Sequence, residues 1–374
     1  MFNWLLGENE ARLGIDLGAS NIKMVELGKE SGRLVLRNYA LAKTKNGEEI
    51  KVDKLTAKEL AEVLKNMARE ANFKSNQASF SLPVGKSFST LIELPQMPEK
   101  ELAAAVPFEA QKYVPVPLEN VVLDWSIVSW NSKEVLSLKE EVKPEAGKMD
   151  ALASEKSSAG QTAPPVIPQS PDIAQKQNFQ ALFENASPRP ALPSSGPSSA
   201  FKPSKGGIQI MLVAVPKEII NFLTKAAALA GLKVLAFEHE AFSLARSLVG
   251  NDASTYLIAD LGPKSADIII VDQQMVKASH SLEAATKEAV LMEIDRVVNF
   301  FQTRYNKKVN QCLLVGGRAT EKETRDFLTS KLRLPMKVGD PFARIQYPSS
   351  LERILKEELG PPLAVAVGLA MRED

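Results

Sequence analysis

The sequence predicts an α/β protein of two lobes, with a small inserted α+β subdomain that carries a long disordered loop. Two similar segments, 244 positions apart, each end an apolar strand in Asp-Leu-Gly and lead through a turn into another strand. A later strand ends in a double glycine, Gly316 and Gly317. Between the two similar segments the composition changes abruptly, which indicates an insertion.

Composition narrows the class of protein. The 374 residues are 44% hydrophobic and 24% charged, which is typical of a globular chain with a sizeable core. A formal net charge of +1 gives no basic surface for nucleic acid. The single cysteine, Cys312, cannot form an internal disulfide, so we interpret it as a buried apolar side chain in a reducing compartment. His239 and His280 have no metal-ligand spacing.

No apolar run approaches the roughly 18–20 residues that a membrane-spanning helix needs. We therefore expect a cytoplasmic protein with no transmembrane segment, and any membrane association through a partner. The first residues include Phe2, Trp4, Leu5 and Leu6. These side chains either touch a membrane surface or pack against the protein itself, and the second interpretation is favoured.

The first third of the chain alternates strands and helices. Thr56 and Glu59 form a capping box, which predicts a helix start. A further helix begins near Glu99, and Pro107 is predicted to kink or split it. The strands expected here are residues 13–16, 22–27, 33–41, 78–82, 88–94 and 121–130.

The chain then changes character. Residues 137–206 hold ten of the 23 prolines and eleven serines, with few large apolar residues. Such a segment cannot bury enough surface to offset its ordering entropy, so it is predicted to be disordered. An island at 171–186 is either a short docking helix or a loosely collapsed linker. We expect the strands at 121–130 and 208–215 to be neighbours, which makes the tract one long loop.

Order is predicted to resume at residue 207. The elements expected are strands at 208–215, 233–238 and 311–315, a hairpin at 256–280, helices at 217–229, 240–248 and 283–305, and a last helix after Pro362. Gly231 is the expected C-cap of the first of these helices. The predicted domains are a first-lobe core at 1–78, the inserted subdomain at 79–230, a return to the first lobe at 231–250, and a second lobe at 251–374.

The two Asp-Leu-Gly turns are suited to a polyphosphate. Glycine lets the backbone approach a phosphate, and exposed turn N–H groups form an anion-binding nest. Asp16 and Asp260 need a cation between themselves and a polyphosphate, which suggests Mg²⁺ held through bound waters. A double glycine after a buried strand lets a flat base or a ribose lie on bare backbone.

The order of two phosphate turns followed by an adenosine strand resembles the actin-like ATPase superfamily. The similarity is closest to the PilM family of type IV pilus assembly proteins, relatives of FtsA, and it covers nearly everything except residues 137–206. The segments that carry it include Ser81-Leu82-Pro83, Ile92-Glu93-Leu94-Pro95, Tyr113-Val114-Pro115, Leu123-Asp124-Trp125 and Glu240-Ala241-Phe242-Ser243-Leu244-Ala245-Arg246.

The resemblance implies an actin-like, ribonuclease-H-like fold that binds ATP and Mg²⁺ between its lobes. It also implies a partner, the cytoplasmic N-terminal peptide of a PilN-like inner-membrane protein, contacts with other pilus assembly proteins, and a position at the inner face of the membrane. Carried over by position, the phosphate and Mg²⁺ residues of the first lobe are Asp16, Gly18, Ala19, Ser20, Asn21 and Lys23. Those of the second lobe are Asp260, Gly262, Lys264 and Ser265, with Gly316, Gly317 and Arg318 beside the adenosine, and Glu293 and Arg296 touching the ribose and base.

Some alternatives stay open. Lys23 is otherwise a solvated strand lysine, and Glu293 with Arg296 an exposed salt-bridge pair. Pro263 removes a backbone donor from the second turn, Arg318 stands where a small residue is common, and residues 279–286 contain no glycine. These departures favour at most a slow ATPase and motivate a second hypothesis, a scaffold that no longer binds nucleotide. A third hypothesis, a small-molecule kinase, needs a base near the γ-phosphate, which the inserted region does not supply.

Overall fold

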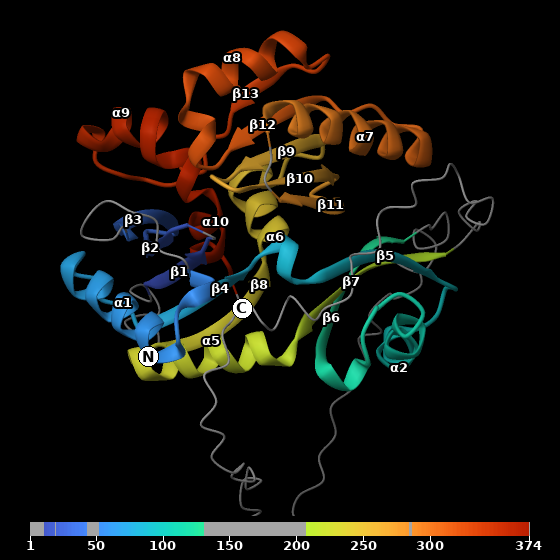
Figure 1. Cartoon of the computed structure of the whole chain (residues 1–374), viewed down its shortest axis with the longest axis horizontal. Coiled ribbons are helices and arrows are strands. Elements are labelled where there is room, and N and C mark those ends of the chain that lie inside the picture. Colours follow the sequence, from blue (N-terminus) through green and yellow to red (C-terminus); the bar gives the residue numbers. More distant parts are fainter. Residues whose placement is uncertain (1–10, 19, 43–51, 131–206, 284–285, 374) are drawn as a thin grey trace, which may run out of the picture.

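The computed structural model describes residues 11–18, 20–42, 52–130, 207–283 and 286–373. Two lobes, each built on its own five-stranded sheet, lie one above the other, and a smaller three-stranded unit extends beside them (Figure 1). This arrangement confirms the predicted two-lobed α/β fold with an inserted subdomain. The tract predicted to be disordered, 137–206, and its apolar island at 171–186 lie outside the described residues.

The first-lobe sheet has the strand order β3-β2-β1-β4-β8. Its strands are β1 (Arg12–Leu17), β2 (Ile22–Glu30), β3 (Arg33–Ala42), β4 (Gln77–Leu82) and β8 (Lys233–His239). β1, β2 and β3 form an antiparallel meander, whereas β4 and β8 are added parallel to β1. Because parallel strands end at the same edge of a sheet, the carboxyl ends of β1, β4 and β8 lie together.

The second-lobe sheet repeats this topology strand for strand, in the order β11-β10-β9-β12-β13. Its strands are β9 (Tyr256–Leu261), β10 (Ser265–Asp272), β11 (Met275–Glu283), β12 (Gln311–Val315) and β13 (Met336–Val338). Asp16 pairs with Lys23 across β1 and β2, and Asp260 pairs with Asp267 across β9 and β10. The two Asp-Leu-Gly turns therefore occupy equivalent places in the two sheets.

The inserted subdomain is an antiparallel sheet of β5 (Phe88–Leu94), β7 (Ile208–Pro216) and β6 (Val121–Trp130), in that order. The pairing of β6 with β7 confirms that these two strands, far apart in the sequence, are neighbours. Helix α2 (Glu99–Ala110) buries Leu102 and Val106 against this sheet. The subdomain thus has an apolar core of its own.

Helices cover the two large sheets. α1 (Ala57–Glu70) and α5 (Lys217–Ala230) pack on each other below the first-lobe sheet (Figure 1). The second lobe carries α7 (Lys287–Tyr305), α8 (Lys322–Lys331) and the short α9 (Glu352–Ile354). The last helix, α10 (Gly360–Ala370), packs against β1, β2 and the short α6 (Glu240–Leu244), and nearly all of its residues are buried.

Glycine allows α10 to approach its neighbours closely. A methyl group on Gly14 of β1 would overlap the carbonyl oxygen of Ala366, and one on Gly368 would overlap that of Ser243. α10 therefore packs almost backbone to backbone on the first lobe, although it follows the second lobe in the sequence.

Several helix ends differ from expectation. α2 runs unbroken through Pro107, so of the two predicted outcomes, a kink or a split, the split is wrong: proline removes a single hydrogen bond there, and the helix ends only three residues later. The long helix starts at Lys287, not Glu283, because β11 extends to Glu283 and Thr286 caps the helix. α6 continues after Leu244 as a π-helical turn, 245–249, and α10 already begins at Gly360.

Other local predictions are confirmed. Thr56 and Glu59 make both hydrogen bonds of the capping box, and Gly231 adopts a left-handed C-cap with φ +77°. Cys312 is fully buried in β12, where burial raises the pKa of its thiol to about 12. Within the described ranges, no helix is both long and apolar enough to cross a membrane.

The domain boundaries remain predictions, and the structure adds two facts about them. β4 (Gln77–Leu82) spans the predicted boundary at 78/79 yet pairs with β1 in the first-lobe sheet. α10 falls within the predicted second lobe yet packs on β1 and β2.

We expect removal of residues 137–206 to leave the fold intact. β6 and β7 stay paired to Trp130 and Ile208, so their ends are adjacent and a short turn can close them. Loop length itself changes the closure free energy by only about 0.6 kcal/mol per doubling. Calorimetry should show one cooperative transition within a few degrees of the full chain, and loss of that transition would contradict the loop interpretation.

Candidate functional site between the lobes

The first turn, residues 16–23, holds a buried carboxylate with fixed partners. Asp16, only 2% exposed, accepts hydrogen bonds from Lys23 Nζ at 2.7 Å and from Ser81 Oγ at 3.2 Å. The same Ser81 hydroxyl accepts from the backbone N–H of Leu17 at 3.0 Å. Strands β1, β2 and β4 therefore all position this one carboxylate, and Lys23 is the buried partner of Asp16, not a solvated strand lysine.

The rest of the first turn leaves a hydroxyl group unused. Ser20 is buried, and its Oγ has no hydrogen-bond partner among the described residues. The backbone at Gly18 lies close to Asn21, where an added methyl group would be 3.2 Å from the Asn21 carbonyl oxygen. Ala19, the remaining predicted residue, lies outside the described part of the chain. An unpaired buried hydroxyl costs stability, so a ligand oxygen at Ser20 would be favourable.

The second turn, residues 260–265, meets the double glycine. Gly316 adopts φ +87°, and a methyl group there would overlap Asp260 Oδ1 and lie 2.5 Å from the carbonyl oxygen of Leu261. Its N–H donates to the carbonyl oxygen of Pro361 at the start of α10. The predicted second turn and the predicted adenosine strand are thus in direct contact.

The other members of the second turn form its tip. A methyl group added to Gly262 would lie 3.3 Å from Ser265 Oγ. Lys264 is exposed. Gly317 follows Gly316 and has open space where a side chain would project. Arg318 belongs to the short 3₁₀ turn that begins at Gly317.

Charged side chains of the two turns interact with one another. Burial lowers the pKa of Lys23, but the carboxylates of Asp16 and Asp260 outweigh it and the net pKa is raised. Burial raises the pKa of Asp260 to about 6, with Lys23 lowering it and Asp16 raising it. Because such effects weaken with distance, Asp260 of the second lobe lies near the Asp16–Lys23 pair of the first lobe.

A fourth charged group in this space was missed by sequence reasoning. Glu240, at the start of α6, is buried, and its pKa is raised well above its ordinary value by burial and then by Asp16, Asp267 and Asp260. It follows directly after β8, whose carboxyl end lies at the same sheet edge as that of β1. Only the parallel pairing of β8 with β4 brings Glu240 to this edge, and no sequence pattern specifies that pairing.

The carboxylates outnumber the cations here, which is the electrostatic setting that a divalent cation or its hydrated complex would stabilise. Within the described ranges, no three acidic, histidine or cysteine side chains converge as a direct metal site. The residues present fit a hydrated Mg²⁺ and a phosphate chain, since Lys23, the Ser20 hydroxyl and glycine backbone can face the phosphate oxygens.

Glu293 and Arg296 form an ion pair with each other, and Glu293 also contacts His280. Arg296 Nε donates to Glu293 Oε2 at 2.9 Å, and His280 Nδ1 of β11 lies 2.7 Å from Glu293 Oε1. These contacts lower the pKa of Glu293 to about 2, against the opposing effect of burial. The pair therefore ties α7 to β11, and its predicted contact with ribose and base remains a prediction.

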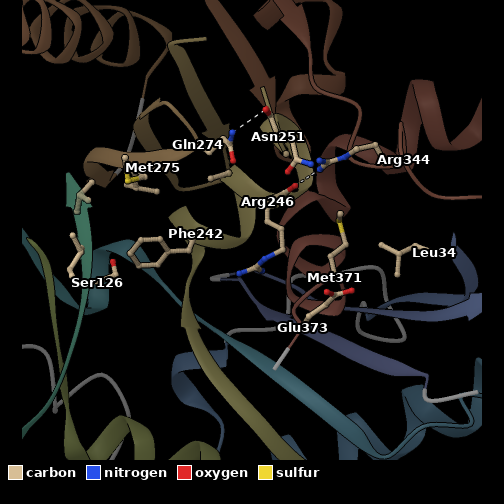
Figure 2. Close-up of a pocket in the computed structure, with 15 residues that line it drawn as sticks. Leu34, Ser126, Phe242, Arg246, Asn251, Gln274, Met275, Arg344, Met371 and Glu373 are labelled. Carbon is tan, nitrogen blue, oxygen red and sulfur yellow. Dashed lines mark hydrogen bonds between the residues drawn. The ribbon is translucent and has the colours of Figure 1, made fainter. Parts of the chain in front are cut away.

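A separate cavity of about 520 Å³ lies away from both turns, where three parts of the protein meet (Figure 2). Its lining comes from the first lobe, from β6 of the inserted subdomain and from the β10–β11 turn of the second lobe. Apolar side chains form much of it: Leu34, Ile127, Val128, Phe242, Met275, Val276 and Met371. We call it the junction cavity; its volume is in the range of ligand-binding pockets.

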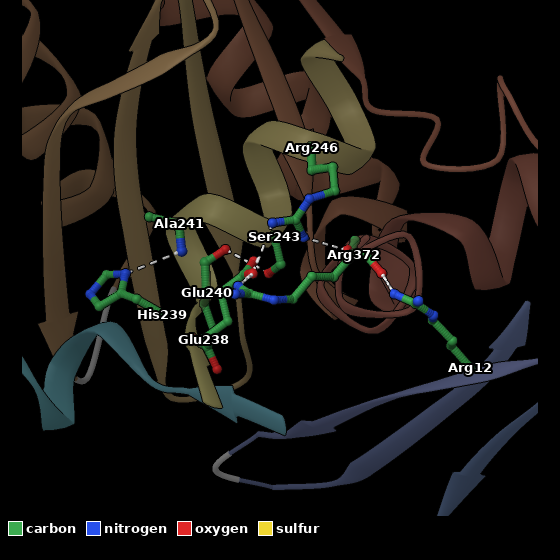
Figure 3. A network of polar contacts seen from close by, with 9 residues as sticks. Arg12, Glu238, His239, Glu240, Ala241, Ser243, Arg246 and Arg372 are labelled. Atoms are coloured by element: carbon green, nitrogen blue, oxygen red, sulfur yellow. Dashed lines mark hydrogen bonds and ion pairs between the residues drawn. The ribbon is translucent and has the colours of Figure 1, made fainter. Parts of the chain in front are cut away.

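An ionic network around the buried Glu238 carboxylate lies on the first-lobe side of this cavity (Figure 3). Glu238 of β8 accepts from Arg246 Nη2 at 2.8 Å and from Arg372 Nη1 at 2.6 Å. Arg246 also donates to the carbonyl oxygen of Gly368, and Arg12 donates to that of Arg372. β1, β8 and the end of α10 are thereby held together next to the cavity.

On the second-lobe side, buried Lys277 of β11 donates to the carbonyl oxygen of Val128 in β6 at 2.8 Å. This bond joins the second lobe to the inserted subdomain at the edge of the junction cavity. The shape of the cavity therefore depends on how the two lobes and the subdomain are placed.

We expect Asp260→Asn to stabilise the protein at pH 8 and not at pH 4. The folded-state pKa of Asp260 is raised, so ionisation opposes folding, and the penalty builds up as pH rises from the ordinary value near 4 to about 6. At pH 8 the gain is about 3 kcal/mol, seen as a higher melting temperature. Asp295→Asn on the exposed side of α7 is the control, and an equal gain at both pH values would contradict the assignment.

Comparison with known proteins gives a family and a fold. A family model described as type IV pilus assembly protein PilM matches residues 14–156 and 280–374. A solved PilM–PilN type IV pilus biogenesis complex is similar at 20% identity and a TM-score of 0.67, covering 97% of this chain and 98% of the other.

Two further solved structures are similar at lower TM-scores. One is a protein of actin-like ATPase fold from Bacteroides thetaiotaomicron, 12% identical with a TM-score of 0.44, covering 95% of this chain and 98% of that one. Another is the cytoplasmic domain of EpsL, from the type II secretion system of Vibrio cholerae, 8% identical with a TM-score of 0.46, covering 98% and 97%.

Proposed function

Because this chain belongs to the PilM family of type IV pilus assembly proteins, we propose that it is an ATP-binding scaffold for the cytoplasmic N-terminal tail of a PilN-like inner-membrane protein. One observation carries the nucleotide part of this proposal: Lys23 of the first lobe forms an ion pair with Asp16 at 2.7 Å and also interacts electrostatically with Asp260 of the second lobe. The solved PilM–PilN complex supports the partner part.

In the nucleotide site, the two turns would hold the phosphates from opposite sides. Lys23, the Ser20 hydroxyl and the Gly18 backbone would face them from the first lobe, and Gly262, Lys264 and Ser265 from the second. Asp16 and Asp260 would hold the water shell of Mg²⁺, which would neutralise charge on the phosphates when bound. Gly316, Gly317 and Arg318 would lie beside the adenosine.

Glu240 is the group best suited to hold a proton next to this site. Burial and the neighbouring carboxylates raise its pKa well above the ordinary value, which favours its protonated form, and Mg²⁺ nearby would favour its ionised form. A slow ATPase would use it to orient water, but a nucleotide-controlled scaffold needs no hydrolysis.

The junction cavity is the site we propose for the partner's tail. It lies between the first lobe and the inserted subdomain, where Phe242 of α6 and Ile127 of β6 offer apolar contacts. β6 is the edge strand of its sheet, so its backbone could also pair with an extended peptide. Since Met275 and Val276 of the second lobe complete the lining, nucleotide between the lobes would change affinity for the tail.

This arrangement would place the protein at the inner face of the membrane through its partner, with other pilus assembly proteins as further contacts. Within the described residues the chain offers no spanning helix of its own.

A scaffold without nucleotide is the second candidate. The ion pairs of Glu293 with Arg296 and His280 favour it, because they occupy side chains that were expected to touch ribose and base. Equilibrium dialysis with Mg·ATP separates the two hypotheses: binding in the micromolar range supports the first, and binding no tighter than millimolar favours the second.

The tail site is tested with labelled synthetic tails of PilN-like proteins. We expect Met275→Arg at the cavity to weaken tail binding at least tenfold, because it puts a charge among apolar side chains (about 1.4 kcal/mol per factor of ten). Met292→Arg on α7, where Met292 is 67% exposed, is the matched control. Titrations by fluorescence anisotropy with and without Mg·ATP measure both effects. Equal binding by the two variants would place the tail elsewhere.

A further inference from the structure

We infer that residues 1–10 of this chain dock in the junction cavity when no partner occupies it. The docking itself stands apart from the proposed function; only the competition with a partner's tail rests on it. The occupant is identified by where the described chain begins, by its apolar side chains and by its charges.

The described chain begins beside the cavity. Arg12 donates from Nη1 to the carbonyl oxygen of Arg372 at 2.6 Å. The neighbours of Arg372, Met371 and Glu373, both line the cavity. Figures 2 and 3 show Arg246 in both views, with Met371 and Glu373 on one side of the cavity and Arg12 beyond Arg372. The described chain therefore begins one arginine side chain away from a residue whose two neighbours line the cavity.

Reach does not limit the docking. Ten extended residues span up to about 33 Å, so the segment can extend across a cavity of about 520 Å³. Its apolar side chains lie at the far end, in Phe2, Trp4, Leu5 and Leu6, and Gly7 follows them. The cavity presents Phe242, Met275 and Met371 to such side chains.

Charge agrees with this direction of entry. Arg344 lines the cavity, and its Nη2 donates to the backbone carbonyl oxygens of Arg246 and Ser247. Burial lowers the pKa of Arg344, so a carboxylate beside it would be stabilising. Glu8 and Glu10 lie between the apolar end of the segment and its attachment at Ala11. They would reach Arg344, since Arg246 is already paired with Glu238, while the apolar end enters the cavity.

The consequence is competition. A tethered segment acts at an effective concentration in the millimolar range, so even weak docking occupies the cavity. A partner's tail would have to displace it, and the apparent affinity for the tail falls by the fraction of free cavity. The chain would thus protect its own apolar cavity until a tail replaces the segment.

The test uses the full chain with Asn3→Cys carrying an environment-sensitive dye. Cys312 is fully buried, so labelling is specific to position 3. We expect blue-shifted emission and iodide quenching about threefold weaker than in the same protein with Met275→Arg, because a tethered ligand leaves only when its site is disrupted. Met292→Arg should leave the signal unchanged. Solvent-exposed emission in all three proteins, or the same signal with Met275→Arg, would overturn the docking.

A second variant avoids any effect on the folded domain. Trp4→Ser with Leu5→Ser changes only the segment, and hydrogen exchange at 126–128 and 274–276 should become faster if the segment covers the cavity. Unchanged exchange would count against the docking. A dye signal that rises with protein concentration would show that a second copy is the occupant, and one that appears only with lipid vesicles would show a membrane contact; either result would overturn it.

Experiments with a PilN-like tail peptide test this inference separately from the proposed function. Removal of residues 2–10 should strengthen binding of a PilN-like tail peptide about tenfold, and the added tail should release the dye. A dye that is docked in a protein that binds no tail leaves the docking standing and removes the proposed partner. A tail that binds without releasing the dye removes the competition and leaves the partner.

Discussion

Lys23→Met should abolish Mg·ATP binding and lower the free energy of unfolding by about 3–5 kcal/mol. Lys23 Nζ is the cationic partner of Asp16, which is 2% exposed. Without it, the Ser81 hydroxyl is the one side-chain donor to Asp16 within the described ranges, while Asp260 contributes a like charge nearby. Urea unfolding measures the loss of stability, and isothermal titration with Mg·ATP measures the loss of binding.

The double variant Asp16→Asn with Lys23→Met distinguishes the structural role of the pair from its role in binding. It removes both charges from the same buried place, so most of the lost stability should return. ATP binding should stay absent, because neither the cation nor the carboxylate is restored. A single Lys23→Met variant as stable as the unchanged protein would contradict the burial of the pair, and one that still binds ATP would remove Lys23 from the phosphate site.

The fold was predictable from the sequence because its signals are local. Each Asp-Leu-Gly turn ends an apolar strand and opens another, and the structure places both at equivalent points of two sheets with the same topology. The prediction that Asp16 and Asp260 have equivalent roles followed from that repetition. The start of α7 was misplaced because Glu283 suits a helix as well as a strand end. Only its pairing with Ser265 in the sheet shows that Glu283 ends β11.

Residues whose role depends on long-range pairing were harder to predict. Glu240 belongs to the site because β8 lies parallel to β4, and no nearby residue signals that register. The contact of His280 with Glu293 likewise depends on α7 packing against β11. The junction cavity draws on segments from Leu34 to Glu373, and no sequence pattern specifies which of them meet.

The two adjacent glycines at 316 and 317 should respond very differently to the same substitution. Gly316→Ala forces a side chain into a left-handed conformation at φ +87° and into the Asp260 carboxylate and Leu261 backbone. Left-handed backbone costs about 1–2 kcal/mol and an overpacked contact about 1–3 kcal/mol. The sum, about 3 kcal/mol, should appear in urea unfolding. Because the displaced group is Asp260 itself, Mg·ATP binding should be lost as well.

Gly317→Ala is the matched control, since a methyl group there meets nothing within 4 Å. Its stability should stay within about 1 kcal/mol of the unchanged protein, because the substitution acts mainly on the unfolded chain. If the adenosine lies on the bare backbone of this segment, the methyl group should still weaken ATP while leaving binding of inorganic triphosphate unchanged. Equal weakening of both ligands would place the adenosine elsewhere. Equal stability of the two alanine variants would mean that Gly316 does not hold the second turn against α10.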